Sequence, residues 1–161
     1  MLLILVEALA MCFILLITCV IAIANGAKGG IALYEEDVQE RAVALGYTTK
    51  AKIRKNLVIL SAAMFIPVFT LVPLMVYCIN GAASFIDAFW QMTAILWIMG
   101  LFDRLFIDWY WVGHTKAWHI PGTEDLKPYI PRSALLVKWL FTLLGFPLIS
   151  ASIAGIISLL S

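Results

Sequence analysis

The densest group of potentially reactive side chains lies between Asp103 and Asp125, in the stretch DRLFIDWYWVGHTKAWHIPGTED. It holds four acids, three tryptophans and both histidines of the chain. Imidazole and carboxylate ligands together suit zinc or non-haem iron, so Asp108, His114 and His119 form a candidate metal site. The wider candidate polar site consists of Asp103, Arg104, Asp108, His114, Lys116, His119 and Glu124.

The spacing of these residues weighs against a metal site built on one helix. His114 and His119 lie five residues apart, whereas the H-E-x-x-H pattern places its histidines four apart on one helical face. Asp103 and Asp108 are also five apart and would point about 140° away from each other at 3.6 residues per turn. Arg104 and Asp108, at i and i+4, have the spacing of an ion pair across one helical turn. The sequence leaves both the metal site and this ion pair open.

Two further acids, Glu7 and Asp87, fall inside apolar stretches without a lysine or arginine near them in the sequence. A carboxylate near hydrocarbon without a cation must be hydrated, protonated or bound to an ion. These acids make a small ion transporter or a proton-coupled transporter one hypothesis for function. Ser84 and Asp87 also form S-x-x-D, a variant of the capping box, and we favour a helix cap as the role of Asp87.

A third polar group consists of four basic residues that precede an apolar stretch. Positive charges in the first turns of a helix oppose the helix dipole, so anionic lipid phosphates are a reason to place them there. A solvated basic rim is the alternative interpretation. The expected ligands of lipid phosphate are Lys50, Lys52, Arg54 and Lys55.

The chain that must position these groups is unusually apolar. Hydrophobic residues make up 63% of its 161 residues and the mean hydropathy is +1.00, whereas a soluble domain is about 45–50% apolar. Apolar residues run continuously, without the alternation of barrel strands, over stretches near or above the roughly 20 residues of a membrane-crossing helix. We therefore predict an all-α integral membrane protein, a four-helix transmembrane bundle in one domain. The expected spans are residues 2–24, 57–78, 84–102 and 134–160, with long loops at 25–56 and 103–133.

The basic residues predict the orientation of this bundle. All 11 lie in the two long loops or just inside the ends of the neighbouring helices. By the positive-inside rule both long loops are cytoplasmic and both termini lie outside. In the first loop, residues 34–45 place Tyr34, Val38, Ala42 and Leu45 at helical spacing, which predicts an amphipathic cytoplasmic surface helix. The two threonines that follow offer a cap for the next helix.

Three loop sequences carry a resemblance to a known group of proteins. They are D-W-Y-W from Asp108, I-P-G-T-E from Ile120 and V-Q-E-R-A-V-A-L-G-Y-T-T from Val38. They resemble the loops of a group of small bacterial multi-pass membrane proteins of unassigned activity. The resemblance covers the two long loops and implies a bacterial plasma (inner) membrane, without a cofactor or catalytic residue to carry over.

The chain lacks the sequence motifs of several functional classes. The chain has no G-x-x-x-x-G-K-[ST], G-x-S-x-G or G-x-G-x-x-G, and its few basic residues beside the membrane disfavour nucleic-acid binding. The leading hypothesis is a non-enzymatic membrane protein whose cytoplasmic loops bind a protein partner or anionic membrane lipids, with a homo-oligomer left open. The alternatives are a metal- or haem-dependent enzyme at the cytoplasmic end of the third helix and the transporter built on Glu7 and Asp87.

Overall fold

The computed structural model describes residues 1–160, which are helical throughout their regular structure and contain no strand. Six α-helices are joined by 3₁₀ and π-helical segments. In chain order the elements are α1 (Leu2–Ala22), η1 (Ala27–Leu33), α2 (Glu36–Ala44), α3 (Lys50–Leu74), η2 (Met75–Ile79), α4 (Phe85–Phe102), η3 (Asp103–Val112), η4 (Glu124–Leu126), α5 (Arg132–Leu140), η5 (Phe141–Gly145) and α6 (Phe146–Leu160).

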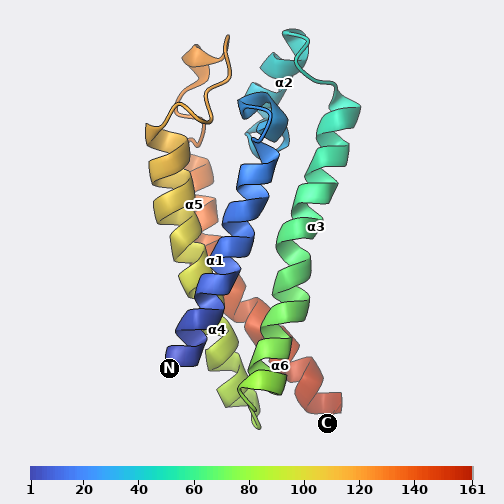
Figure 1. The fold of residues 1–161 in the computed structure, drawn as a ribbon, viewed down its shortest axis with the longest axis vertical. Helices are drawn as coiled ribbons and strands as arrows, with labels where there is room; N and C mark the ends of the chain where they lie inside the picture. Colours follow the sequence, from blue (N-terminus) through green and yellow to red (C-terminus); the bar gives the residue numbers. More distant parts are fainter. Residues whose placement is uncertain (161) are drawn as a thin grey trace.

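Four continuous helical runs are long and apolar enough to cross a membrane, as the sequence predicts. All but the first of these runs include a π-helical segment. Figure 1 shows α1, α3 and α4 along the long axis of the molecule, with both chain ends at the end opposite α2. The four runs are Leu2–Ala22, Lys50–Ile79, Phe85–Val112 and Arg132–Leu160.

The third run extends further than the sequence predicts, whereas the second begins where the threonine cap predicts. The sequence places residues 103–112 in a loop, and they continue the third helix as η3 for 10 residues. They stay helical because the charge of Arg104 is neutralised inside the helix by the neighbouring aspartates. The second run begins at Lys50 because Thr49 caps it, its Oγ1 accepting a hydrogen bond from the backbone N–H of Lys52 at 3.3 Å.

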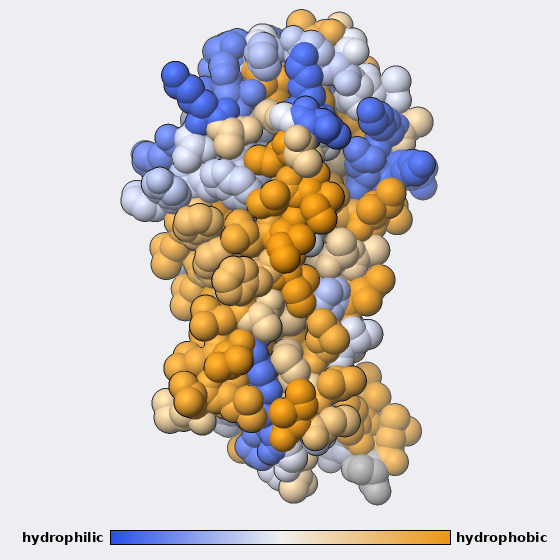
Figure 2. Space-filling view, in the orientation of Figure 1, coloured by the Kyte–Doolittle hydropathy of each residue, from blue (hydrophilic) through white to orange (hydrophobic). Residues whose placement is uncertain are grey.

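The outer surface divides into an apolar belt and a polar end. Figure 2 shows hydrophobic residues over the middle and lower parts of the molecule and hydrophilic residues at the upper end, where Figure 1 places α2. Large apolar side chains are exposed on all four runs, including Phe13 (61%), Ile66 (59%), Trp90 (55%) and Leu148 (68%). Such a belt exceeds the isolated patches of a soluble monomer and suits contact with hydrocarbon.

Helix α4 occupies the centre of the bundle, because it packs along both α1 and α6. Ala8 of α1, Ala88 of α4 and Ala154 of α6 are fully buried, and such small side chains let helix backbones approach closely. At Gly100 of α4 an added Cβ atom would lie 2.6 Å from Cε2 of Phe146 and 2.7 Å from Cγ2 of Thr142. Glycine is therefore needed where η5 and α6 cross α4.

Prolines accompany two of the three π-helical segments. Pro73 lies two residues before η2, and Pro147 lies two residues after η5. A proline lacks the N–H of the helical ladder and its ring crowds the carbonyl four residues earlier. For Pro147 that carbonyl belongs to Leu143, inside η5, where the π-turn rearranges the hydrogen bonds. The third segment, η3, contains no proline and instead carries buried charges.

The polar end is one packed unit made from both long loops. The expected surface helix is present as α2, and Tyr34, Val38 and Ala42 are buried, whereas Leu45 is 42% exposed. The hydroxyl of Tyr34 donates a 2.5 Å hydrogen bond to the backbone carbonyl of Trp118 in the second loop. Burial raises the pKa of Tyr34, so its hydroxyl stays a donor.

Exposed contacts complete this link between the loops. The guanidinium of Arg41 lies 3.1 and 2.9 Å from the two carboxylate oxygens of Asp125, and it donates to the backbone carbonyl of Gly122 at 3.2 Å. The hydrogen bond from Arg41 lowers the pKa of Asp125. Gly122 has φ +84°, the conformation that a Pro-Gly type II turn requires.

Candidate functional site

Four charged side chains meet inside the bundle, on the side of the polar end. Arg104 pairs with both Asp103 and Asp108, and Nζ of Lys138 lies 3.2 and 3.4 Å from the two carboxylate oxygens of Asp108. Arg104 is only 8% exposed and Asp108 only 7%. The two positive and two negative charges balance. We call Asp103, Arg104, Asp108 and Lys138 the ionic cluster.

Both aspartates reach one guanidinium from within the π-helical segment η3. Hydrogen bonds in a π-helix join residues five apart, so such residues lie nearly above one another. The prediction that Asp103 and Asp108 point apart was wrong because it assumed an α-helix. The pair of Arg104 and Asp108 is confirmed. Sequence reasoning missed the role of Lys138, although this residue is the only charge in the fourth apolar stretch.

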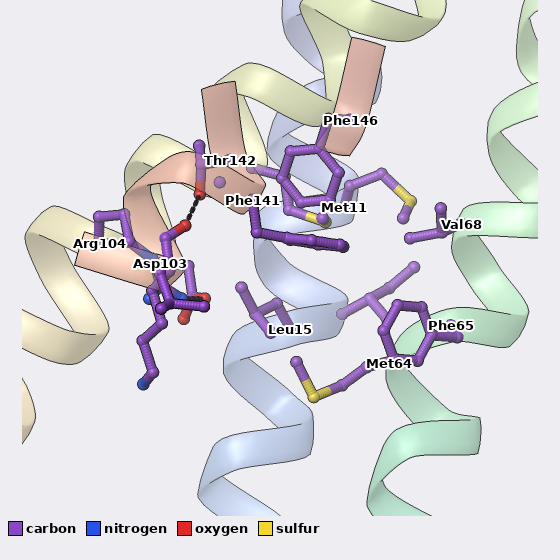
Figure 3. A pocket seen from close by; sticks show the side chains of 15 residues that line it. Met11, Leu15, Met64, Phe65, Val68, Asp103, Arg104, Phe141, Thr142 and Phe146 are labelled. Atoms are coloured by element: carbon purple, nitrogen blue, oxygen red, sulfur yellow. Dashed lines mark hydrogen bonds and ion pairs between the residues drawn. The ribbon is translucent and has the colours of Figure 1, made fainter. Parts of the chain in front are cut away.

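An apolar cavity of about 340 Å³ opens beside the ionic cluster. Its walls come from α1, α3, α4, η3, α5, η5 and the first residue of α6. Figure 3 shows Asp103 and Arg104 of η3 at one side, with Met64, Phe65 and Val68 of α3 across from them. The lining residues are Met11, Ile14, Leu15, Met64, Phe65, Val68, Met99, Gly100, Asp103, Arg104, Val137, Lys138, Phe141, Thr142 and Phe146.

The apolar cavity reaches the apolar belt. Three of its lining residues, Phe65, Val137 and Phe141, are 43%, 65% and 45% exposed. The cavity therefore joins a buried set of charges to the apolar outer surface of the molecule.

A second cavity of about 220 Å³ lies between the ionic cluster and the polar end. Asp103, Arg104 and Lys138 line both cavities, and Tyr34 and Trp118 of the polar end line the second one. The ionic cluster thus separates an apolar space from one with aromatic and hydroxyl groups.

One donor of the ionic cluster has no acceptor among the described residues. Nε of Arg104 is buried and makes no hydrogen bond there, although the other guanidinium nitrogens face carboxylates. An unpaired buried donor costs about 1–3 kcal/mol, more where the group is charged. A ligand with an acceptor oxygen in either cavity would offset that cost.

The remaining residues of the candidate polar site lie outside the ionic cluster. Nδ1 of His114 lies 2.6 Å from the carbonyl of Trp109, and Nε2 of His119 lies 3.1 Å from Oε1 of Glu124. Backbone N–H groups of Glu124 itself and of Gly122 lower the pKa of Glu124. Lys116 is exposed.

The proposed metal ligands share a cavity but do not form a metal site. Asp108, His114 and His119 line a third cavity of about 420 Å³, yet Asp108 is occupied by Arg104 and Lys138. Across residues 1–160, no group of three or more histidine, cysteine or acidic side chains is placed to hold a metal ion. The geometry therefore gives the metal hypothesis no ligand set.

The four basic residues at the start of α3 are exposed at the rim of the polar end. Lys50 lies 4.0 Å from Glu40, the longest of the ion pairs in the described chain. Lys52 lines a groove of about 390 Å³ between α1, η1 and α3, together with Lys28, Asn25 and Asn56. Arg54 and Lys55 are likewise exposed.

The two acids of the apolar stretches lie at the opposite end, in one hydrogen-bonded network. Asn80 donates to Glu7 at 2.9 Å and to Gln91 at 2.8 Å, and Gln91 donates to Asp87 at 2.8 Å. Ser84 caps α4 by accepting from the N–H of Asp87 at 3.2 Å, as the serine of the S-x-x-D pattern predicts, whereas the carboxylate of Asp87 accepts from Gln91. Sequence reasoning missed Asn80, which follows the second apolar stretch directly.

Comparison of the chain with protein-family models, with curated proteins and with solved structures finds no match in any of the three.

Proposed function

We propose that this chain is a multi-pass protein of the bacterial plasma membrane that binds one amphiphilic lipid molecule in the apolar cavity beside Arg104. The hydrocarbon part of the ligand lies among the apolar side chains of the cavity. Its polar part offers an acceptor oxygen to the ionic cluster. The protein acts as a lipid-binding protein without a covalent reaction.

The membrane setting is supported by the four apolar runs and by the distribution of charge. The basic residues gather toward one end of the molecule, and the end with Glu7 and Asp87 has neither lysine nor arginine. Under the positive-inside rule the polar end is cytoplasmic and both termini are outside. This orientation places the ionic cluster in the cytoplasmic half of the bilayer.

The observation that carries the proposal is the buried Nε of Arg104 beside a cavity with apolar walls. A volume of about 340 Å³ falls within the range of small-molecule sites, roughly 300–1,000 Å³. Because the cluster already balances its own charge, a neutral acceptor suits Nε of Arg104 better than an anionic one. The ester carbonyl oxygens of lipids are such acceptors.

The exposed basic rim supports the same class of ligand. Lys50, Lys52, Arg54 and Lys55 lie where a cytoplasmic headgroup layer would meet α3, and each basic residue near an anionic surface contributes about 1 kcal/mol. The rim would gather anionic lipids, while the cavity selects one molecule.

The test compares two tryptophan substitutions on α5. Val137 and Leu136 are both 65% exposed, but only Val137 lines the apolar cavity. Val137→Trp narrows the cavity without touching the ionic cluster, and Leu136→Trp adds the same bulk to the belt. The proteins are purified from nanodiscs of phosphatidylethanolamine and phosphatidylglycerol, and retained lipid is counted by native mass spectrometry.

We expect the wild type and Leu136→Trp to retain one lipid molecule per chain. Val137→Trp should retain at least about tenfold less, which corresponds to 1.4 kcal/mol. Equal retention by the two variants, or no retained lipid in the wild type, would refute the proposal.

A further inference from the structure

The network around Glu7 contains two buried acceptor atoms that lack a donor. Glu7 is only 4% exposed, and its Oε1 makes no hydrogen bond within residues 1–160. Oδ1 of Asn80 is likewise buried without a partner. Both atoms belong to the same pair of side chains, whose other atoms already form a hydrogen bond of 2.9 Å from Nδ2 of Asn80 to Oε2 of Glu7.

A single proton on Glu7 would satisfy both atoms. A protonated carboxyl group is a donor through its O–H and an acceptor through its carbonyl oxygen, and a carboxamide has the matching acceptor and donor. The carbonyl oxygen of Glu7 would keep the bond from Asn80, while its hydroxyl would donate to Oδ1 of Asn80. An ionised Glu7 has no donor to offer, so both acceptors would stay unpaired at a cost of about 1–3 kcal/mol each.

No lysine or arginine of the neighbouring elements is available to stabilise the ionised form. Residues 1–27 and 56–103, which form α1, η2, α4 and most of α3, contain neither lysine nor arginine. The one amine of these segments is the N-terminus at Met1, which is fully exposed, whereas Glu7 is buried six positions further along α1. The remaining titratable groups are Asp87 of α4, Asp103 at the start of η3, Tyr77 and Cys78 of η2, and Cys12 and Cys19 of α1. A buried carboxylate without a paired cation is strongly disfavoured.

The network also connects the buried carboxyl group to the surface. Asp87 is exposed at the start of α4, and Gln91 and Asn80 join it to Glu7 through bonds of 2.8, 2.8 and 2.9 Å. We propose that Glu7 and Asn80 form a proton-binding site of the bundle, which exchanges its proton at the end of the molecule where Asp87 is exposed. This proton-binding site is separate from the lipid site proposed in the apolar cavity and does not depend on it.

Release of the proton leaves Glu7 negatively charged among α1, η2 and α4. The carboxylate must then be hydrated, which requires water to enter between these elements. Protonation thus stabilises the contact of α1 with η2 and α4, and proton loss weakens it.

The test uses the full chain in nanodiscs at neutral pH and infrared spectroscopy of the carboxyl C=O stretch. We expect a band of a neutral carboxylic acid in the wild type and in Asp87→Asn, and its loss in Glu7→Gln. If Glu7→Gln does not fold, Asn80→Ser replaces it, because removal of the amide partner shifts the band of Glu7 alone. A missing band in the wild type, or a band that neither Glu7→Gln nor Asn80→Ser changes, overturns the proposal.

Thermal unfolding in detergent provides the second measurement. The amide of Glu7→Gln has a donor where the acid has its hydroxyl, so the melting temperature should stay within about 2 °C of the wild type. Glu7→Ala should melt several degrees lower. If Glu7→Gln is as unstable as Glu7→Ala, Glu7 does not carry a proton in the folded protein and the proposal fails. If the carboxylic acid band is absent and the melting temperature rises with Na⁺, the site binds a metal cation instead.

Discussion

Removal of Arg104 tests whether the ionic cluster is held by charge balance. Arg104→Met keeps the length and the apolar stem of the side chain but leaves two aspartates with Lys138 as their only cation. Arg104 and Asp108 are 8% and 7% exposed, so the range for breaking a buried ion pair applies, about 3–5 kcal/mol. At roughly 2–4 °C per kcal/mol for a chain of this size, the melting temperature should fall by about 6–20 °C.

A second substitution restores the balance. In Arg104→Met with Asp108→Asn, one carboxylate, Asp103, remains with one cation, Lys138, so the cluster is neutral again. Thermal unfolding in detergent, followed by tryptophan fluorescence, should place the double variant above Arg104→Met and below the wild type. A double variant no more stable than Arg104→Met, or a loss below about 1 kcal/mol in Arg104→Met, would show that charge balance does not hold the cluster together.

Three further substitutions, one of them with a matched control, test the elements that position the site. Gly100→Ala should destabilise by about 1–3 kcal/mol because α4 has no room for a Cβ, whereas Gly113→Ala, whose Cβ would meet only a backbone oxygen at 3.4 Å, should leave the melting temperature unchanged. Thr49→Ala should cost about 1 kcal/mol through loss of the α3 cap, measured in the same melts. The contact of Arg41 with Asp125 should hold the two loops together at neutral pH and be lost as the pH falls through the pKa of Asp125, which its hydrogen bond from Arg41 lowers. Hydrogen exchange of the polar end should therefore rise in acid in the wild type, and Arg41→Gln should show that fast exchange at every pH.

The sequence predicts the four long helices because each is a nearly uninterrupted apolar stretch of about the length that crosses a membrane. It also predicts local contacts that depend only on neighbours along the chain. The cap by Ser84, the turn at Gly122 and the pair of Arg104 and Asp108 are all of this kind, and each joins residues at most four positions apart. Contacts between residues far apart in the chain cannot be predicted in this way.

Lys138 and Asn80 illustrate why. The bond of Lys138 to Asp108 crosses 30 positions, and that of Asn80 to Glu7 crosses 73. No periodicity within one helix indicates which residue of another helix lies opposite. Both could have been suspected from chemistry, since a lysine within an apolar stretch and an amide at its end need partners once lipid surrounds them.

The boundary of the third helix shows how hydropathy misjudges paired charges. A hydropathy scale adds the full transfer cost of Asp103, Arg104 and Asp108, and so ends the apolar stretch at residue 102. The structure instead buries these residues as partners, with a second cation from α5, so that the cost of each charge is offset by its neighbours. Because η3 continues the third helix without a break, both acids reach the guanidinium of Arg104 from one helical run, so the length of the third helix and the existence of the ionic cluster have the same origin.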